Sequence, residues 1–202
     1  MRAQVKRARQ PASPNDWIED SRARNGSRIR ISHSSAARVD IELECRPRAW
    51  GAVPGKSCSQ APHYHTVAFE WLTVRRGTLG ISIDGIEQIV TAENGTIAVH
   101  RTARHYIWNA AQDADLEVQL TLSPARNAEQ LYRTVYGLAY DYGSPAAVPL
   151  LQSVVTHAAA DMPLAAVPPV VWRLLVKTVV VFVARLAGYR AFEEDYTVFT
   201  GP

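Results

Sequence analysis

The stretch from residue 62 to residue 77 reads PHYHTVAFEWLTVRRG, and its spacing decides how the chain is interpreted. Alternate side chains of a β-strand point to the same side, so His63 and His65 can face one interior. Glu70 lies five residues beyond His65, and this odd offset would place its carboxylate on the other face of a regular strand. A turn or bulge within residues 66–69 would return it to the histidine side. The stretch therefore predicts a strand with a local irregularity.

A third histidine, His105, comes forty residues after His65 and leads another alternating segment, residues 106–109. Three imidazoles and one carboxylate form a ligand set that suits Fe, Mn, Ni, Zn or Cu as a divalent ion. His100, at the end of the preceding segment, is the alternative last ligand. We therefore predict a cofactor of one divalent metal ion, of open identity, on His63, His65, Glu70 and His105.

Short segments with the strand period surround these residues and are separated by turn signals every 8–12 residues. Asp84-Gly85 between two of them favours a tight hairpin, because both central residues must take positive φ. This pattern indicates an antiparallel sandwich or barrel. The expected strands are residues 29–31, 39–43, 63–75, 79–83, 86–91, 96–100, 106–109 and 115–122.

The first of these histidine motifs resembles that of the cupins, which reads G-x5-H-x-H-x3-4-E-x6-G. Here His63, His65, Glu70 and Gly77 keep every spacing after the first histidine. The leading glycine has its counterpart in Gly55, two residues upstream of the expected position. The resemblance implies a mainly β fold, a single cupin (double-stranded β-helix, jelly-roll) barrel over residues 31–124.

The second cupin motif reads G-x5-P-x-G-x2-H-x3-N, and Gly95, His105 and Asn109 occupy its conserved ends. Between Gly95 and His105 the chain has nine residues where the family has ten, so the turn before His105 is rebuilt. The whole chain also resembles small single-domain cupins of fungal natural-product pathways, whose helices end in a Gly-Tyr-Arg tail like that at Gly188.

After Pro124 the period of the apolar residues changes from two to 3.6, which indicates helices over residues 125–202. We expect helices at residues 128–140, from Ser144-Pro145 onward, and at residues 169–187. The last carries three cations within an apolar sequence, which argues against a membrane span. Packing on the barrel, packing on a partner in an expected homodimer, and peripheral membrane contact through residues 170–187 remain open.

Residues 1–30 carry eight Lys and Arg against three acidic residues, whereas the remainder of the chain has a net charge of −2. We interpret residues 1–30 as a basic, flexible N-terminal arm. No basic stripe interleaved with aromatic residues follows, so we expect no nucleic acid partner. The N-terminus lacks the apolar run of a secretory signal, which favours a cytoplasmic location, with membrane association left open.

The chain has two cysteines, Cys45 and Cys58, too few for a disulfide framework and spaced unlike a zinc motif. Reduced thiols are the expected state in a cytosolic protein, and a Cys45–Cys58 bridge is the alternative.

The resemblance to cupins implies a metal-dependent enzyme acting on an oxygen-bearing polyketide, phenolic or terpenoid intermediate. It would work by oxygenation or by Lewis-acid stabilisation of an enolate. A non-redox isomerase, cyclase, decarboxylase or dehydratase and a non-catalytic binding protein are the alternatives. Glu70 is the expected catalytic base. From strand parity, Leu72, Ile107 and Asn109 are the expected pocket-lining residues.

Overall fold

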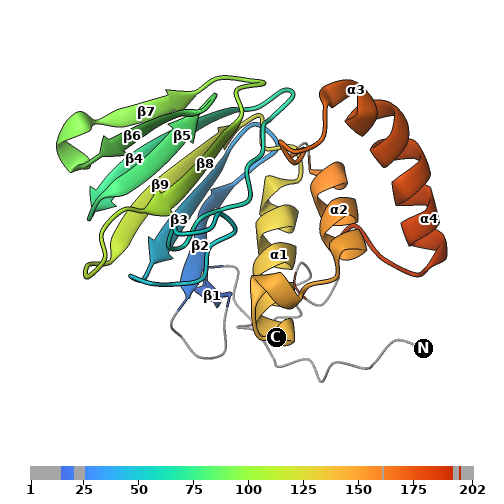
Figure 1. Ribbon diagram of the computed structural model, residues 1–202, viewed down its shortest axis with the longest axis horizontal. Coiled ribbons are helices and arrows are strands. Elements are labelled where there is room, and N and C mark those ends of the chain that lie inside the picture. Colours follow the sequence, from blue (N-terminus) through green and yellow to red (C-terminus); the bar gives the residue numbers. More distant parts are fainter. Residues whose placement is uncertain (1–14, 21–25, 161, 193–195, 197–202) are drawn as a thin grey trace.

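The computed structural model describes residues 15–20, 26–160, 162–192 and 196. Its strands form two antiparallel sheets that face each other, with the helices gathered on one side (Figure 1). A six-stranded sheet has the order β1-β2-β3-β9-β4-β7, and a three-stranded sheet has the order β6-β5-β8. The strands are β1 (Ile18–Glu19), β2 (Ser27–Ser34), β3 (Val39–Cys45), β4 (Phe69–Arg76), β5 (Leu79–Ile83), β6 (Ile86–Val90), β7 (Thr96–Val99), β8 (His105–Asn109) and β9 (Leu116–Ser123).

Strict alternation of apolar and polar residues explains the larger sheet. Along β9 every second side chain, from Leu116 to Leu122, is buried, and the residues between them are partly exposed. The register pairs Leu120 with Leu72 of β4 and with Ile41 of β3, so apolar side chains of three strands meet on one face. Together with apolar side chains of β5 and β8 they form one continuous core, which confirms the mainly β fold.

The hairpin between β5 and β6 forms as its sequence predicts. Asp84 and Gly85 take φ values of 50° and 85°, and the register closes with Ile83 opposite Ile86. A two-residue turn of this kind matches the twist of the strands that it joins. A short 3-10 turn, η1 (Ala92–Asn94), then leads into β7.

The sheet begins earlier in the chain than predicted. β1 and part of β2 lie within the range assigned to a flexible arm, and Ile18 pairs with Ile29. Asp20 anchors this segment, because its carboxylate accepts hydrogen bonds from the backbone N–H (2.9 Å) and hydroxyl (2.5 Å) of Ser27. Residues 1–14 and 21–25 of the predicted arm lie outside the described residues.

The cysteine expectation is corrected. Cys45 at the end of β3 and Cys58 form a disulfide, with 5.9 Å between their Cα atoms. Sequence spacing cannot show that the loop after β3 folds back against its own strand. The bridge ties this loop, which contains Trp50, to the sheet.

Two helices pack beside the barrel, α1 (Ala128–Tyr142) and α2 (Leu150–Ala159). The helix expected from Ser144 is only one turn, η2 (Pro145–Ala147), because Pro149 cannot donate the hydrogen bond that would continue it. The chain then forms one continuous helix, built of α3 (Pro169–Val171), the π-helical η3 (Trp172–Val180) and α4 (Val181–Leu186), which we call the C-terminal helix.

The C-terminal helix packs on α2. Trp172 and Val176 form a small apolar cluster with Ala158, separate from the barrel core. Among the helices that the structure describes, none combines the length and the hydropathy needed to cross a membrane.

Candidate metal centre

The four predicted ligands come from three places in the fold. Glu70 lies on β4 and His105 begins β8, whereas His63 and His65 lie in the loop before β4 rather than on a strand. The chain bends at residues 66–67, inside the segment where the sequence predicted an irregularity. This bend lets the two histidines and the glutamate face the same interior.

Backbone hydrogen bonds fix the loop that carries His63 and His65. The N–H of His63 donates to the carbonyl of His105 at 3.0 Å, and the N–H of His105 donates back at 2.8 Å. The N–H of Thr102 donates to the carbonyl of His65 at 2.7 Å. On the other side, the N–H of Tyr64 donates to the carbonyl of Pro163 at 3.1 Å, in the segment after α2. The ligand loop thus lies between barrel and helices.

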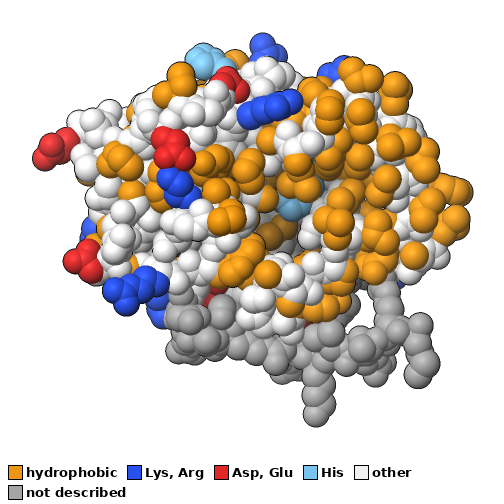
Figure 2. All heavy atoms as spheres, in the orientation of Figure 1, with side chains coloured by type: hydrophobic (Ala, Val, Ile, Leu, Met, Phe, Trp, Pro, Cys, Tyr) orange, Lys and Arg blue, Asp and Glu red, His pale blue; other side chains and the backbone are white. Residues whose placement is uncertain are grey.

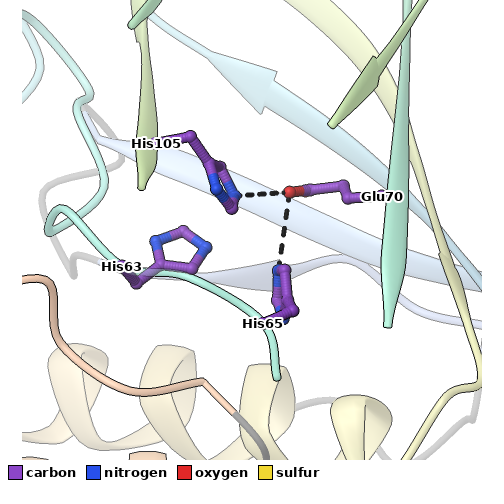
Figure 3. A group of neighbouring side chains, drawn as sticks. All are labelled: His63, His65, Glu70 and His105. Atoms are coloured by element: carbon purple, nitrogen blue, oxygen red, sulfur yellow. Dashed lines mark ion pairs between the residues drawn. The ribbon is translucent and has the colours of Figure 1, made fainter. Parts of the chain in front are cut away.

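The four side chains converge on one buried point (Figure 3). One ligand atom from each lies within 4.8 Å of the others, and all four residues are at most 3% exposed. Oε2 of Glu70 is 2.7 Å from Nε2 of His105 and 3.6 Å from Nε2 of His65. Three imidazoles and one carboxylate at these separations could hold a divalent metal ion.

The ring orientations also fit a metal ion. Nδ1 of His63 lies 2.8 Å from the carbonyl of Ala61, and Nδ1 of His105 lies 3.0 Å from that of Ala103. A ring that donates from Nδ1 keeps the lone pair of Nε2 for a metal. Nε2 of His63 is buried and has no hydrogen-bond partner among the described residues, so an ion would satisfy an otherwise orphaned atom.

The pKa shifts follow from burial and from the close contact of unlike groups. Burial lowers the pKa of His63 well below its ordinary value, and the neighbouring histidines lower it further. Burial alone would raise the pKa of Glu70, but its close contacts with His105 and His65 outweigh this and lower it. Burial would lower the pKa of His105, yet Glu70 raises it. Glu70 is therefore ionised and His63 neutral, which are the forms that bind metal.

The other predicted site residues lie elsewhere. His100, the alternative ligand, is exposed and contacts the ring of Phe69, outside the group. Leu72 and Ile107 belong to the apolar core. Asn109 donates hydrogen bonds from Nδ2 to the carbonyls of Cys45 and Ala114.

A cavity of about 320 Å³ opens beside the ligands, between the barrel and the helices. His63 lines it, and none of the three predicted pocket residues does. Strand parity identified the inward face correctly, but close-packed core side chains fill that face at Leu72 and Ile107. That these three residues line a substrate pocket stays a prediction.

Sequence reasoning missed two polar residues of this cavity, Gln60 and Tyr132. Oε1 of Gln60 and the hydroxyl of Tyr132 are buried and have no hydrogen-bond partner of normal geometry among the described residues. Burial raises the pKa of Tyr132 well above its ordinary value, the charge of Glu70 raises it further, and the Gln60 amide offsets part of this rise. Tyr132 lies on α1, and no local pattern indicates that this helix turns a hydroxyl toward the barrel.

Comparison with known sequences gives fungal relatives. No protein-family model matches the chain. A probable oxidoreductase, patJ, of Penicillium expansum is 31% identical over 90 residues, which cover 44% of this chain and 28% of that protein. The protein of the same name in Aspergillus clavatus matches at the same identity and coverage. The chain thus spans little more than a quarter of the length of these relatives.

Several of the solved structures similar to this chain are described as cupins or as a double-stranded β-helix protein. KdgF from Halomonas sp. is 17% identical with a TM-score of 0.44, covering 56% of this chain and 91% of that one. A predicted oxalate decarboxylase from Thermotoga maritima is 20% identical with a TM-score of 0.42, covering 54% and 90%.

An RmlC-like cupin from Shewanella frigidimarina is 19% identical with a TM-score of 0.42, covering 55% of this chain and 86% of that one. The two facing antiparallel sheets and the buried group of three histidines and one glutamate agree with the double-stranded β-helix fold that the two sequence motifs imply.

Proposed function

We propose that the protein is a metal-dependent enzyme that transforms an oxygen-bearing small molecule. One observation supports this above all: four buried ligand atoms lie within 4.8 Å of one another, and His63 among them also lines a cavity. A bound divalent ion would supply Lewis-acid or redox chemistry at this point. The three imidazoles and the carboxylate of Glu70 would hold it, and the cavity would hold the substrate.

Glu70 is also the proposed proton acceptor, as the one carboxylate in the group. When its carboxylate is not bound to the ion, Oε2 of Glu70, which lies 2.7 Å from Nε2 of His105, can take up a proton. His63 and His105 have Nδ1 contacts that direct Nε2 toward an ion, which makes these two rings less suited to this role.

Tyr132 is the proposed hydrogen-bond donor to a substrate oxygen. Its raised pKa keeps the hydroxyl protonated, and apart from the neighbouring Gln60 amide the hydroxyl has no hydrogen-bond partner among the described residues. A substrate oxygen near the ligands would fill that place, with Gln60 beside it. The matching test is Tyr132→Phe, which should leave metal content unchanged and weaken binding of a catechol to the metal-loaded protein.

The substrate class follows from the cavity. Its walls are mainly apolar, with a few polar groups such as His63, Gln60 and His157, and its volume is at the lower end of the range of roughly 300–1,000 Å³ for ligand pockets. A compact polyketide, phenolic or terpenoid intermediate with oxygen functions fits this character. Oxygenation is the leading reaction, because the fungal relative is called a probable oxidoreductase. Lewis-acid isomerisation, cyclisation, decarboxylation or dehydration is the alternative.

The decisive experiment measures metal content after loading with iron, manganese, nickel, zinc or copper. Wild type should bind one ion, and His63→Ala and His105→Ala should each lose it. His100→Ala is the matched control, because this exposed histidine lies outside the group. Failure of the wild type to bind any of these metals would remove the proposal. Ligand binding that survives EDTA and both alanine variants would favour a non-catalytic binding protein.

Oxygen dependence separates the two reaction classes. Iron-loaded protein is incubated with candidate phenolic and polyketide substrates in air and under anaerobic conditions. Turnover that requires oxygen selects the oxygenase, and equal turnover in both conditions selects the non-redox reactions.

A further inference from the structure

The C-terminal helix exposes an apolar surface that nothing in the described structure covers. Trp172 and Ala184 face inward and are at most 1% exposed, whereas Leu174 is 69% exposed and Leu186 is 74% exposed. Figure 2 shows apolar side chains gathered over this side of the molecule. We call these residues the apolar face: Val170, Val171, Leu174, Leu175, Val179, Phe182, Val183 and Leu186.

The apolar face continues toward the cavity. α4 contacts α2, and the first residues of α2, Leu150 and Leu151, are also exposed apolar side chains. Leu150 lines the cavity as well. The exposed apolar surface therefore reaches from the C-terminal helix to the rim of the cavity.

The charged residues of the C-terminal helix have one sign. Residues 169–186 contain Arg173, Lys177 and Arg185 and no acidic residue, although in the sequence Asp161 precedes the helix and three acidic residues follow it at 193–195. The side chains of Arg173 and Arg185 are exposed on the same helix as the apolar face. Apolar side chains next to cations, with no anions among them, are the combination that binds the surface of an anionic bilayer.

We propose that the apolar face is a docking surface for an anionic phospholipid membrane, with the C-terminal helix lying along the bilayer surface. A second copy of this chain fits less well. A two-fold contact would place the same patch on both subunits, and this patch supplies cations to both sides without an acidic partner. Lipid phosphates supply the missing negative charge.

Docking in this way would bring the cavity rim at Leu150 close to the lipid phase. A small apolar molecule dissolved in the bilayer could then enter the cavity with little exposure to water. This consequence rests on the proposed function, whereas the docking itself does not.

The test is flotation of the full chain with vesicles of phosphatidylcholine alone or of phosphatidylcholine with phosphatidylglycerol. Wild type should float with the mixed vesicles and much less with the neutral ones. The double variant Leu174→Ser and Phe182→Ser, the paired serine variant, should bind the mixed vesicles at least about tenfold more weakly, because it lacks two apolar side chains that would insert into the bilayer. The matched control is Ile86→Ser and Ile89→Ser in β6. These side chains are 67% and 59% exposed and lie outside the apolar face, so this variant should bind like wild type.

The cations are tested separately. Arg173→Gln and Arg185→Gln should each weaken binding to the mixed vesicles roughly fivefold and leave binding to neutral vesicles unchanged. Circular dichroism and thermal melting check that each variant is folded. If the paired serine variant melts early, Leu186→Ser takes its place, because that side chain is 74% exposed.

Three outcomes overturn the proposal. The first is that wild type fails to float with the anionic vesicles. The second is that the control pair loses as much binding as the paired serine variant. The third is that analytical ultracentrifugation shows a dimer for wild type and a monomer for the paired serine variant, in which case the apolar face is an interface between copies.

Discussion

The barrel and the C-terminal helix are both rich in apolar residues, and they place them in opposite ways. In β9 each apolar side chain from Leu116 to Leu122 is at most 2% exposed and packs in the core. In the C-terminal helix most of the large apolar side chains face outward. Burial makes the first group a source of folding free energy, whereas the second group stabilises the described fold very little. Hydropathy alone therefore does not tell which residues hold a protein together.

Truncating a core residue should give the largest effect. Leu72→Ala removes a fully buried side chain of β4 that lies opposite Leu120, so it should lower the free energy of unfolding by about 3 kcal/mol. Urea unfolding followed by tryptophan fluorescence measures this. A loss below about 1 kcal/mol would mean that the barrel is less tightly packed than its burial indicates.

Removing the disulfide should give the second-largest loss of stability. The Cys45–Cys58 bridge closes a short loop of 13 residues, and its loss should cost up to about 3 kcal/mol in stability. Reductant should lower the melting temperature of wild type. Cys45→Ser should melt at that lower temperature whether or not reductant is present. Two titratable thiols in the folded protein without reductant would contradict the bridge.

Acid should weaken the helical side through His157. Burial lowers the pKa of this α2 histidine, so below its ordinary value of 6.5 the unfolded chain binds more protons than the folded one. Stability then falls as pH falls below that value. His157→Gln should reduce the slope by at most about 1.4 kcal/mol per pH unit.

Urea unfolding at about pH 7.5 and about pH 5.5 gives this slope for both proteins. Some slope should remain in the variant, because burial also lowers the pKa of His63. Identical slopes in wild type and variant would show that His157 is charged or solvated in the folded protein.

The smallest effect should come from the apolar face itself. Leu174→Ala changes a side chain that is 69% exposed, so the free energy of unfolding should stay within about 0.5 kcal/mol of wild type. The same urea experiment measures it beside Leu72→Ala. A loss as large as that of Leu72→Ala would mean that Leu174 is buried in solution, and the contrast between the two regions would fail.

The sequence predicts those features that repeat or that depend on fixed spacing. Alternation gave the strands, Asp84-Gly85 gave the hairpin, and the motif spacing gave the four residues that now lie together. Even the bend at residues 66–67 follows, because Glu70 cannot otherwise reach the side of His65.

Features made by contacts between distant segments do not follow from spacing. Tyr132 and Gln60 border the cavity only because α1 docks beside the barrel, and the disulfide forms only because a loop folds back on β3. Strand parity likewise placed Leu72 and Ile107 facing inward, but it could not show that they pack in the core and do not line this cavity. The pairing of β1 with β2, next to the contact of Asp20 with Ser27, likewise joins separate segments of the chain.

The loop that holds the first ligand is shared between two parts of the molecule. His63 pairs with His105 of the barrel and with Leu164 beyond α2, and the N–H of Ala165 donates to the carbonyl of Pro62 at 2.8 Å. A barrel excised from its helices would therefore lose one of the two backbone clamps on its first histidine. A movement of the segment around Leu164 would therefore also move the ligand loop, which carries His63. The helices are thus part of the frame that sets the position of this ligand.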